Sequence, residues 1–214
     1  MNVLKLFLLA ALTAAPLLSR AQATFLQDLN GQVIFSSKYT DVQGSPYFSD
    51  AWTVGSVVSL SNKTYAGLKV RFDAYAGELE YEEKGKPYRL AANQIRGFSM
   101  LAGGDTLRFT ALPGSGPNPF FQVLYDGATQ LLKQTRISLT EVQLYNSASP
   151  TKEFSRSEQY FVRKADGSLH KLTRSRKALV ALFPEQKEAV EKATRGVDLT
   201  DEAALVDVFA RLNP

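Results

Sequence analysis

The sequence predicts an α+β fold: a mostly antiparallel β-sheet, or an open barrel or sandwich, followed by about three C-terminal α-helices. Between residues 43 and 173, apolar and polar residues alternate in short runs that are separated by turns rich in Gly, Pro, Asn and Asp. The last forty residues change to a period of about 3.6, which is typical of amphipathic helices. Strands followed by helices favour two segregated parts over an alternating α/β fold. We expect about eight to ten strands.

Residues 1–23 are predicted to be a secretory signal peptide. Lys5 precedes an apolar run over residues 6–18, and small side chains then allow cleavage after Ala21 or after Ala23. The apolar run is shorter than the roughly 20 residues that a helix needs to cross a bilayer. We therefore expect an exported protein, periplasmic or extracellular in a Gram-negative bacterium, with no transmembrane segment after signal cleavage.

Three segments follow the signal peptide. Residues 24–42 form either an edge strand or an N-terminal arm, and the sequence fits both alternatives. Residues 43–173 are expected to form the β-rich domain. Residues 174–214 are expected to form a helical subdomain that packs on it, because their apolar faces need a partner.

The clearest strand runs over residues 68–74, where apolar and charged side chains alternate one by one. Residues 79–82 alternate in the same way after a break at Ala76-Gly77, so we expect the two segments to form a hairpin. Upstream, residues 52–60 are rich in β-branched side chains and form another expected strand.

Two tighter hairpins are indicated by Asp-Gly dipeptides, which suit the positive φ angles of a two-residue type I′ turn. The first turn is expected at Asp126-Gly127 and the second at Asp166-Gly167. Between these hairpins, the polar residues 146–157 are expected to form an irregular connector.

Three helices are expected near the C-terminus. Residues 175–183 are apolar on nearly all sides, which predicts a short buried helix. Residues 185–195 form a second helix that ends at Gly196. The third helix has a plain amphipathic stripe and is expected to be capped by Asp198 or Thr200.

Composition excludes several classes of protein. The 214 residues carry a net charge of +4, and removal of Lys5 and Arg20 with the signal peptide leaves 23 basic and 21 acidic residues, a net charge of +2. Such a balance gives no support to nucleic-acid binding. The chain has no cysteine, which excludes disulfides, thiolate metal sites, a cysteine nucleophile and a lipidated cysteine. An exported chain without disulfides fits a bacterial periplasm.

No motif predicts catalysis. His170 is the only histidine, and the chain has no Gly-x-Ser-x-Gly sequence around a serine. One histidine without cysteine cannot supply the usual zinc ligands, and the Asp-rich loop of a calcium site is missing. We therefore predict no catalytic residue, no metal site and no cofactor.

Carboxylate pairs are the remaining catalytic candidates, since a glycan hydrolase needs only two acidic side chains in a cleft. Glu78, Glu80, Glu82 and Glu83 are the obvious residues. Because three of them alternate on one side of a strand, we expect them to lie on a solvated polar face.

Aromatic residues mark one candidate binding site. Tyr47, Phe48 and Trp52 place three large rings around a turn before the first strong strand. Such rings either stack on sugar rings or fill a corner of the core.

Cationic residues mark a second candidate site, which would face anionic lipid headgroups or an acidic partner. The alternative is that the cations are spread over several solvated faces. The six cations are Arg163, Lys164, Lys171, Arg174, Arg176 and Lys177.

The order of these features resembles an uncharacterised family of exported proteins from Gram-negative bacteria. The resemblance is carried by Gly44-Ser45-Pro46-Tyr47, by residues 52–57 and 68–75, and by the tail over residues 179–212. It implies a strand-rich body that ends in a helical tail. It implies no activity and no site residue.

The sequence therefore predicts a non-catalytic binding or interaction protein of the periplasm or cell envelope. Its partner is expected to be an envelope protein, a glycan or an anionic lipid. Two alternatives stay open: a carrier of an apolar ligand or lipid in a cavity of the β-domain, and a carboxylate-dependent glycan hydrolase.

Overall fold

The structure, a computed structural model, describes residues 31–34, 38–143 and 150–212, and these residues form one twelve-stranded sheet and three α-helices. Eleven strands follow the order β1-β6-β5-β4-β3-β7-β8-β9-β10-β11-β12, and β2 pairs with β11. The strands are β1 (Gln32–Val33), β2 (Val42–Gln43), β3 (Thr53–Ser59), β4 (Thr64–Asp73), β5 (Glu78–Glu83), β6 (Lys86–Ala91), β7 (Ile95–Ala102), β8 (Asp105–Ala111), β9 (Phe120–Tyr125), β10 (Gln130–Val142), β11 (Thr151–Arg163) and β12 (Leu169–Leu172).

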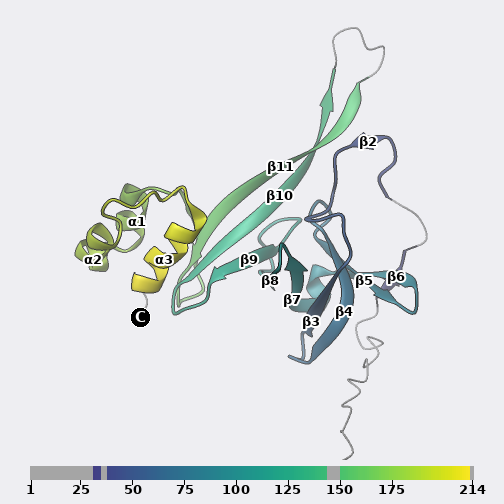
Figure 1. Cartoon of the computed structure of the whole chain (residues 1–214), viewed down its shortest axis with the longest axis horizontal. Helices are drawn as coiled ribbons and strands as arrows, with labels where there is room; N and C mark the ends of the chain where they lie inside the picture. The colour runs from purple at the N-terminus through teal and green to yellow at the C-terminus, as the bar shows by residue number, and fades with distance from the viewer. Residues whose placement is uncertain (1–30, 35–37, 144–149, 213–214) are drawn as a thin grey trace, which may run out of the picture.

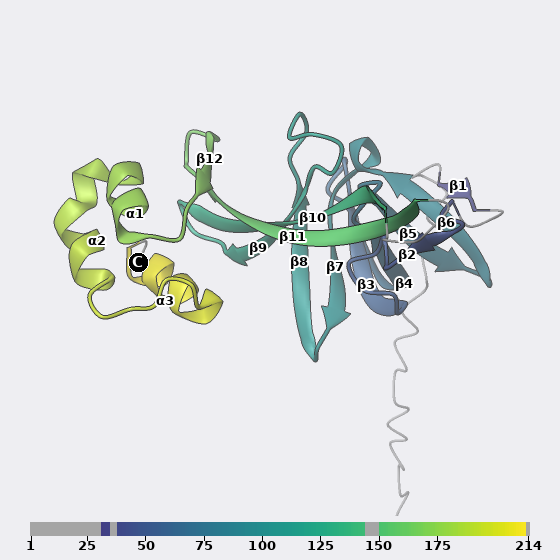
Figure 2. The ribbon, with the colours of Figure 1, turned by 90° about the horizontal axis from the view of Figure 1, so that it is seen from above.

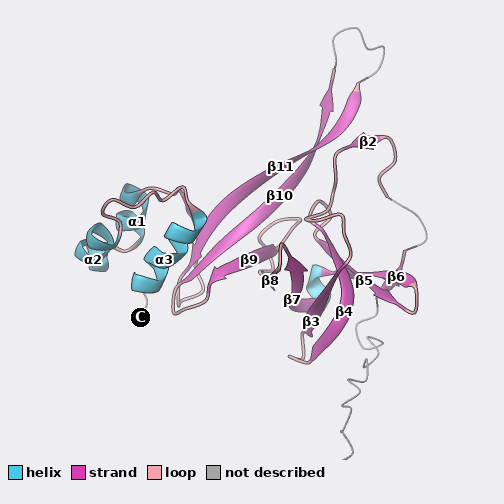
Figure 3. Ribbon diagram, in the orientation of Figure 1, coloured by secondary structure: helices cyan, strands magenta, loops and turns pink. Residues whose placement is uncertain are grey.

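The predicted α+β class is confirmed. All strand pairs are antiparallel except β2 with β11. Figures 1 and 3 show α1, α2 and α3 gathered at one end of the molecule, with β1 to β8 at the other. The ribbon of β10 and β11 spans both ends, as the view in Figure 2 also shows. The strand number exceeds the expected eight to ten because β1 and β2 have only two residues each.

The alternation in β4 produces two different faces. Val70 and Phe72 point inward and are fully buried. The ring centroid of Phe72 lies 5.1 Å from that of Phe98, and the rings of Phe109 and Phe120 lie 5.6 and 5.5 Å away. These rings come from β7, β8 and β9, so the inner face of β4 lies at the centre of the apolar core of the β-domain.

The two Asp-Gly hairpins exist, but the predicted two-residue turns are wrong. The loop between β9 and β10 contains residues 126–129, and that between β11 and β12 contains residues 164–168. In the first loop the ring of Tyr125 lies against Gly127. In the second, the Asp166 carboxylate accepts hydrogen bonds from the backbone and hydroxyl of Ser168.

The predicted irregular connector is also wrong for residues 151–157; residues 146–149 lie outside the described part. β11 begins at Thr151, and its ladder with β10 continues without interruption from Gln130↔Arg163 to Val142↔Thr151. This outer part of the ribbon is largely exposed, so polar residues fit a strand there. The polar composition of residues 151–157 therefore reflects an exposed strand, and it was wrong to interpret it as a loop.

The helices are α1 (Arg176–Leu182), α2 (Lys187–Ala193) and α3 (Glu202–Leu212). The Ser175 hydroxyl accepts a hydrogen bond from the backbone of Ala178 and caps α1. The predicted cap of α3 is wrong: Asp201, rather than Asp198 or Thr200, accepts the hydrogen bond from Ala204. Asp198 instead holds the preceding turn through the backbone and hydroxyl of Thr200.

The three helices form a second apolar core with β12 and with the ends of β10 and β11 that lie next to the helices. Leu131, Val162, Leu179, Leu205 and Phe209 are fully buried within it. At its margin, Glu202 of α3 accepts a hydrogen bond from Tyr160 (2.7 Å) and forms an ion pair with Lys133 (2.7 Å). Helix α3 is therefore held on the sheet by both apolar and polar contacts.

No helix in residues 31–34, 38–143 and 150–212 is long and apolar enough to cross a membrane. The predicted signal peptide, residues 1–23, lies outside the described residues.

Candidate functional site

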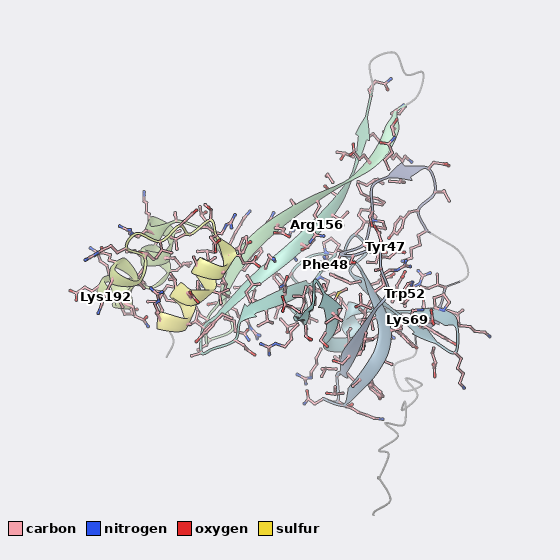
Figure 4. All side chains as sticks on the ribbon, in the orientation of Figure 1. Tyr47, Phe48, Trp52, Lys69, Arg156 and Lys192 are labelled. Carbon is pink, nitrogen blue, oxygen red and sulfur yellow. The ribbon has the colours of Figure 1, made fainter. Side chains whose placement is uncertain are left out.

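The three rings predicted as a binding site are divided between two places. Phe48 packs against the apolar core, with its ring centroid 5.3 Å from that of Phe109. Tyr47 and Trp52 instead line a cleft on the outer face of the sheet. Figure 4 shows Tyr47 and Trp52 at the end of the molecule opposite Lys192 of the helical subdomain. Phe48 therefore fills a corner of the core, while ring stacking by Tyr47 and Trp52 stays a prediction.

Register places charged residues opposite one another on the outer face of β4, β5 and β6. Arg71 pairs with Glu80, and Glu80 pairs with Arg89 on its other side. Residues opposite each other in an antiparallel sheet point to the same face. A row of cation, carboxylate and cation therefore crosses three strands, and Trp52 lies at its end against the Arg71 guanidinium.

Arg71 is the best-connected member of this row. Its Nε and Nη2 donate to one carboxylate oxygen of Glu80, Oε2, at 3.0 and 2.6 Å. The guanidinium carbon lies 3.8 Å from the ring centroid of Tyr47 and 4.6 Å from that of Trp52. Planar guanidinium groups stack on aromatic faces in this way. Arg71 thus fixes both rings relative to the sheet.

The expectation that the β5 glutamates are solvated is wrong for Glu80, which is 6% exposed. Glu78 forms an ion pair with Lys38, and Glu82 forms one with Lys69 at 2.9 Å. The alternation of residues along β5 correctly placed these carboxylates on the face opposite the apolar core. It did not show that cations from β4 and from residue 38 would cover them.

Among the described residues, Arg89 forms no ion pair as short as those of Arg71 and Lys69. Its Nη1 lies 3.8 Å from Glu78 Oε2, an oxygen that already contacts Lys38. Its Nε is buried and has no hydrogen-bond partner among the described residues. A buried donor without an acceptor lowers stability by about 1–3 kcal/mol, so it calls for an explanation.

Tyr39 and Asp73 connect the chain before β3 to the sheet. The Tyr39 hydroxyl donates to Asp73 Oδ2 at 2.6 Å, while Asp73 Oδ1 accepts from the backbone of Tyr75 and Ala76. Burial, opposed by these hydrogen bonds, raises the pKa of the Asp73 carboxyl. Burial and the neighbouring Glu80 raise the pKa of Tyr47 to about 12, so this hydroxyl keeps its proton near neutral pH.

These residues enclose a cleft of about 430 Å³, here called the outer cleft. Its volume falls in the usual range of small-molecule sites. Its lining residues come from β4, β5 and β6 and from the chain before β3: Ile34, Lys38, Tyr39, Tyr47, Trp52, Arg71, Glu80, Glu82, Pro87 and Arg89.

Residues 38–52, here called the covering segment, are held in place by β11. Gly44 has a φ of +79°, and a Cβ there would lie 3.0 Å from the carbonyl oxygen of Phe154. Arg156 donates from Nη1 to the backbone oxygen of Phe48 at 2.8 Å. The long β11 ribbon therefore positions one wall of the outer cleft.

Two of the six predicted surface cations, Arg174 and Arg176, form contacts within the fold. The Arg174 guanidinium lies 4.5 Å from the Tyr160 ring centroid and donates to the backbone of Thr200. Arg176 donates to the backbone oxygen of Thr194 at 3.0 Å. These two cations stabilise the helical subdomain. Lys171 and Lys177 are exposed, whereas Arg163 and Lys164 are half-buried. Binding of an anionic surface by these four stays a prediction.

His170 lies beside Ser168 and Asp166, but not in a catalytic order. The Ser168 hydroxyl donates to Asp166 at 2.6 Å and lies 3.0 Å from His170 Nε2. The serine therefore separates the carboxylate from the imidazole, whereas a catalytic triad places the imidazole between them. In the described part of the chain, no group of three or more acidic or histidine side chains is arranged to hold a metal ion.

The sequence pointed to Glu80 only as a possible catalytic carboxylate, and it did not indicate Arg71 or Arg89. A usable signal was present, because the hairpin of residues 68–74 and 79–82 places Lys69, Arg71 and Asp73 opposite three glutamates. No family model, curated protein or solved structure matches this chain. The resemblance to an exported family therefore stays a prediction, and the site is argued from its geometry alone.

Proposed function

We propose that this chain is an exported protein of the periplasm or cell envelope of a Gram-negative bacterium, and that it acts by binding a small ligand in the outer cleft. One observation carries the binding proposal: the buried Arg89 Nε, a donor without a partner, belongs to a residue that lines an aromatic cleft of suitable size. A buried donor without a partner is rare in a folded protein, and a ligand that supplies an acceptor would satisfy it.

We propose a non-catalytic role because the carboxylates of β5 in and beside the outer cleft are ion-paired. The general acid of a glycan hydrolase must carry a proton before it acts. Glu78, Glu80 and Glu82 each contact a lysine or arginine, which is the arrangement of anions. The lipid-carrier alternative gains no support, because the rings of Phe72, Phe98 and Phe120 pack against one another in the β-domain core.

Binding can be tested with the only tryptophan of the chain, Trp52, which lines the outer cleft. The mature protein would be titrated with soluble oligosaccharides, amino acids, nucleosides and short peptides while Trp52 emission is recorded. We expect at least one class to shift the emission, and the shift to disappear in an Arg89→Ala variant. A Lys192→Ala variant, changed on the distant α2, serves as the control (Figure 4). No response to any class contradicts the proposal.

Export and the absence of catalysis have separate tests. In a Gram-negative host, the full chain is expected in the periplasmic fraction with a new N-terminus after Ala21 or Ala23. A cytoplasmic product that keeps Met1 contradicts export. Prolonged incubation with any bound oligosaccharide should release no new reducing ends, and their appearance would favour the glycan hydrolase.

A further inference from the structure

We infer that the ligand of the outer cleft is a neutral saccharide, whose ring stacks on Trp52 and whose hydroxyl groups bind Arg89 and the neighbouring glutamates. This inference rests on the proposed function and names the ligand class of the same site. It is carried by the charge balance of the cleft, by the aromatic contacts of Arg71 and by the hydrogen-bonding groups around Arg89.

The charge balance disfavours a charged ligand. Each lining cation, Lys38, Arg71 and Arg89, lies within 4 Å of a glutamate oxygen. A ligand anion placed against Arg89 would also face Glu78 and Glu80, and a ligand cation placed against these glutamates would face the arginines. Desolvating an ion without a net opposite charge is unfavourable. A neutral ligand avoids this penalty.

The aromatic contacts disfavour a cationic ligand for a second reason. Tyr47 and Trp52 both lie within 5 Å of the Arg71 guanidinium, so the protein's own cation already uses their electron-rich faces. A quaternary ammonium or arginine ligand would compete with Arg71, which is also anchored on Glu80. Trp52 is partly exposed and lines the outer cleft, and an exposed indole suits the C–H face of a sugar ring.

The hydrogen-bonding groups favour a polyol. Arg89 offers an unused donor at Nε, and Glu80 and Glu82 offer acceptors on the same face of the sheet. A sugar hydroxyl accepts from one group and donates to another, and adjacent hydroxyls can do so along the row. An apolar ring leaves the buried Arg89 donor unsatisfied, and that loss discriminates strongly against such a ligand.

The test compares matched trisaccharides of different charge. The probes are neutral trisaccharides of glucose, galactose, mannose and N-acetylglucosamine, an acidic trimer of galacturonate, a cationic trimer of glucosamine, and triglycine as a non-sugar. Binding to the mature protein is measured by Trp52 emission and by calorimetry. We expect at least one neutral trisaccharide to bind more tightly than the charged trimers.

Variants then assign the contacts. We expect Arg89→Ala to weaken binding of the neutral trisaccharide at least tenfold and Trp52→Ala, followed by calorimetry, to weaken it by a similar factor. Lys192→Ala should bind as the wild-type protein does, and the melting temperature of every variant is measured alongside. The affinity should also change less than twofold between about 50 and about 500 mM salt, since a neutral ligand forms no screened ion pair.

The outcomes separate this inference from the proposed function. If only the acidic or cationic trimer or triglycine binds, in an Arg89-dependent manner, the neutral saccharide is excluded while the binding function stands. If no probe binds, both are contradicted. If a neutral trisaccharide binds equally well to Arg89→Ala, the ligand lies elsewhere and the assignment of the outer cleft is wrong.

Discussion

The inner face of β4 packs Val70 and Phe72 against rings from β7, β8 and β9, whereas its outer face presents Lys69, Arg71 and Asp73 to carboxylates and tyrosines. Both faces are covered, and on the outer side the neighbouring β6 carries Arg89 Nε, a buried donor without a partner among the described residues. This difference shows that alternation along a strand separates its two faces. It does not predict which face is exposed to solvent. Stability is expected to reside in the inner face and recognition in the outer face.

The largest expected effect is on the inner face. Phe72→Ala removes a side chain whose ring lies beside four other phenylalanine rings and leaves a cavity at the centre of the β-domain core. We expect the free energy of unfolding to fall by roughly 3–5 kcal/mol, as is usual for a buried phenylalanine. Urea denaturation of the mature protein measures it. A loss below about 1 kcal/mol would show that the inner face is not the stabilising one.

A smaller loss is expected when the central ion pair of the outer face is broken. Glu80→Gln keeps the shape of the side chain but removes the charge that binds Arg71, and both side chains are largely buried. We expect a loss of roughly 2 kcal/mol, typical of a hydrogen bond to a charged group. Tyr47 and Trp52 should lose their order together with Arg71, so the emission of Trp52 should shift as well. An unchanged emission maximum would separate Arg71 from the aromatic wall.

The buried carboxyl of Asp73 predicts a pH dependence of moderate size. Because burial raises its pKa, the folded state binds this proton more tightly than the unfolded state does. The contribution of Asp73 to the free energy of unfolding is therefore greatest below the unfolded pKa and is lost as the pH rises through the folded pKa. Asp73→Asn lacks this titration.

Denaturation of both proteins at several pH values measures the difference. Relative to Asp73→Asn, the wild-type protein should become more stable as the pH falls from neutral. A difference that stays constant over this range would show that Asp73 titrates as an exposed carboxyl does.

The smallest effect is expected at the rim of the outer face. The ion pair of Lys69 with Glu82 is half exposed on the lysine side, and such pairs contribute about 0–1 kcal/mol. Lys69→Ala should therefore leave the free energy of unfolding nearly unchanged. The affinity for a ligand of the outer cleft should also change little. A loss comparable to that of Glu80→Gln would mean that the whole charged face, rather than its buried row, stabilises the fold.

The sequence predicted the fold class and the β4–β5 hairpin because local periodicity determines both. It did not predict the outer cleft, because Tyr39 and Tyr47 reach that face from a segment with no regular pattern of its own. The turn at Asp126-Gly127 was predicted too short, because the loop between β9 and β10 contains residues 126–129. Long-range coverage and side-chain packing, rather than propensity, produced the differences.

The free energy of unfolding of Arg89→Ala tests the central claim most directly. If the Arg89 guanidinium serves recognition, its removal should leave that free energy unchanged or raise it by up to about 3 kcal/mol, because its buried Nε forms no hydrogen bond with the described residues. A loss of more than about 2 kcal/mol, in the range of a broken structural network, would contradict the claim and assign Arg89 to the fold.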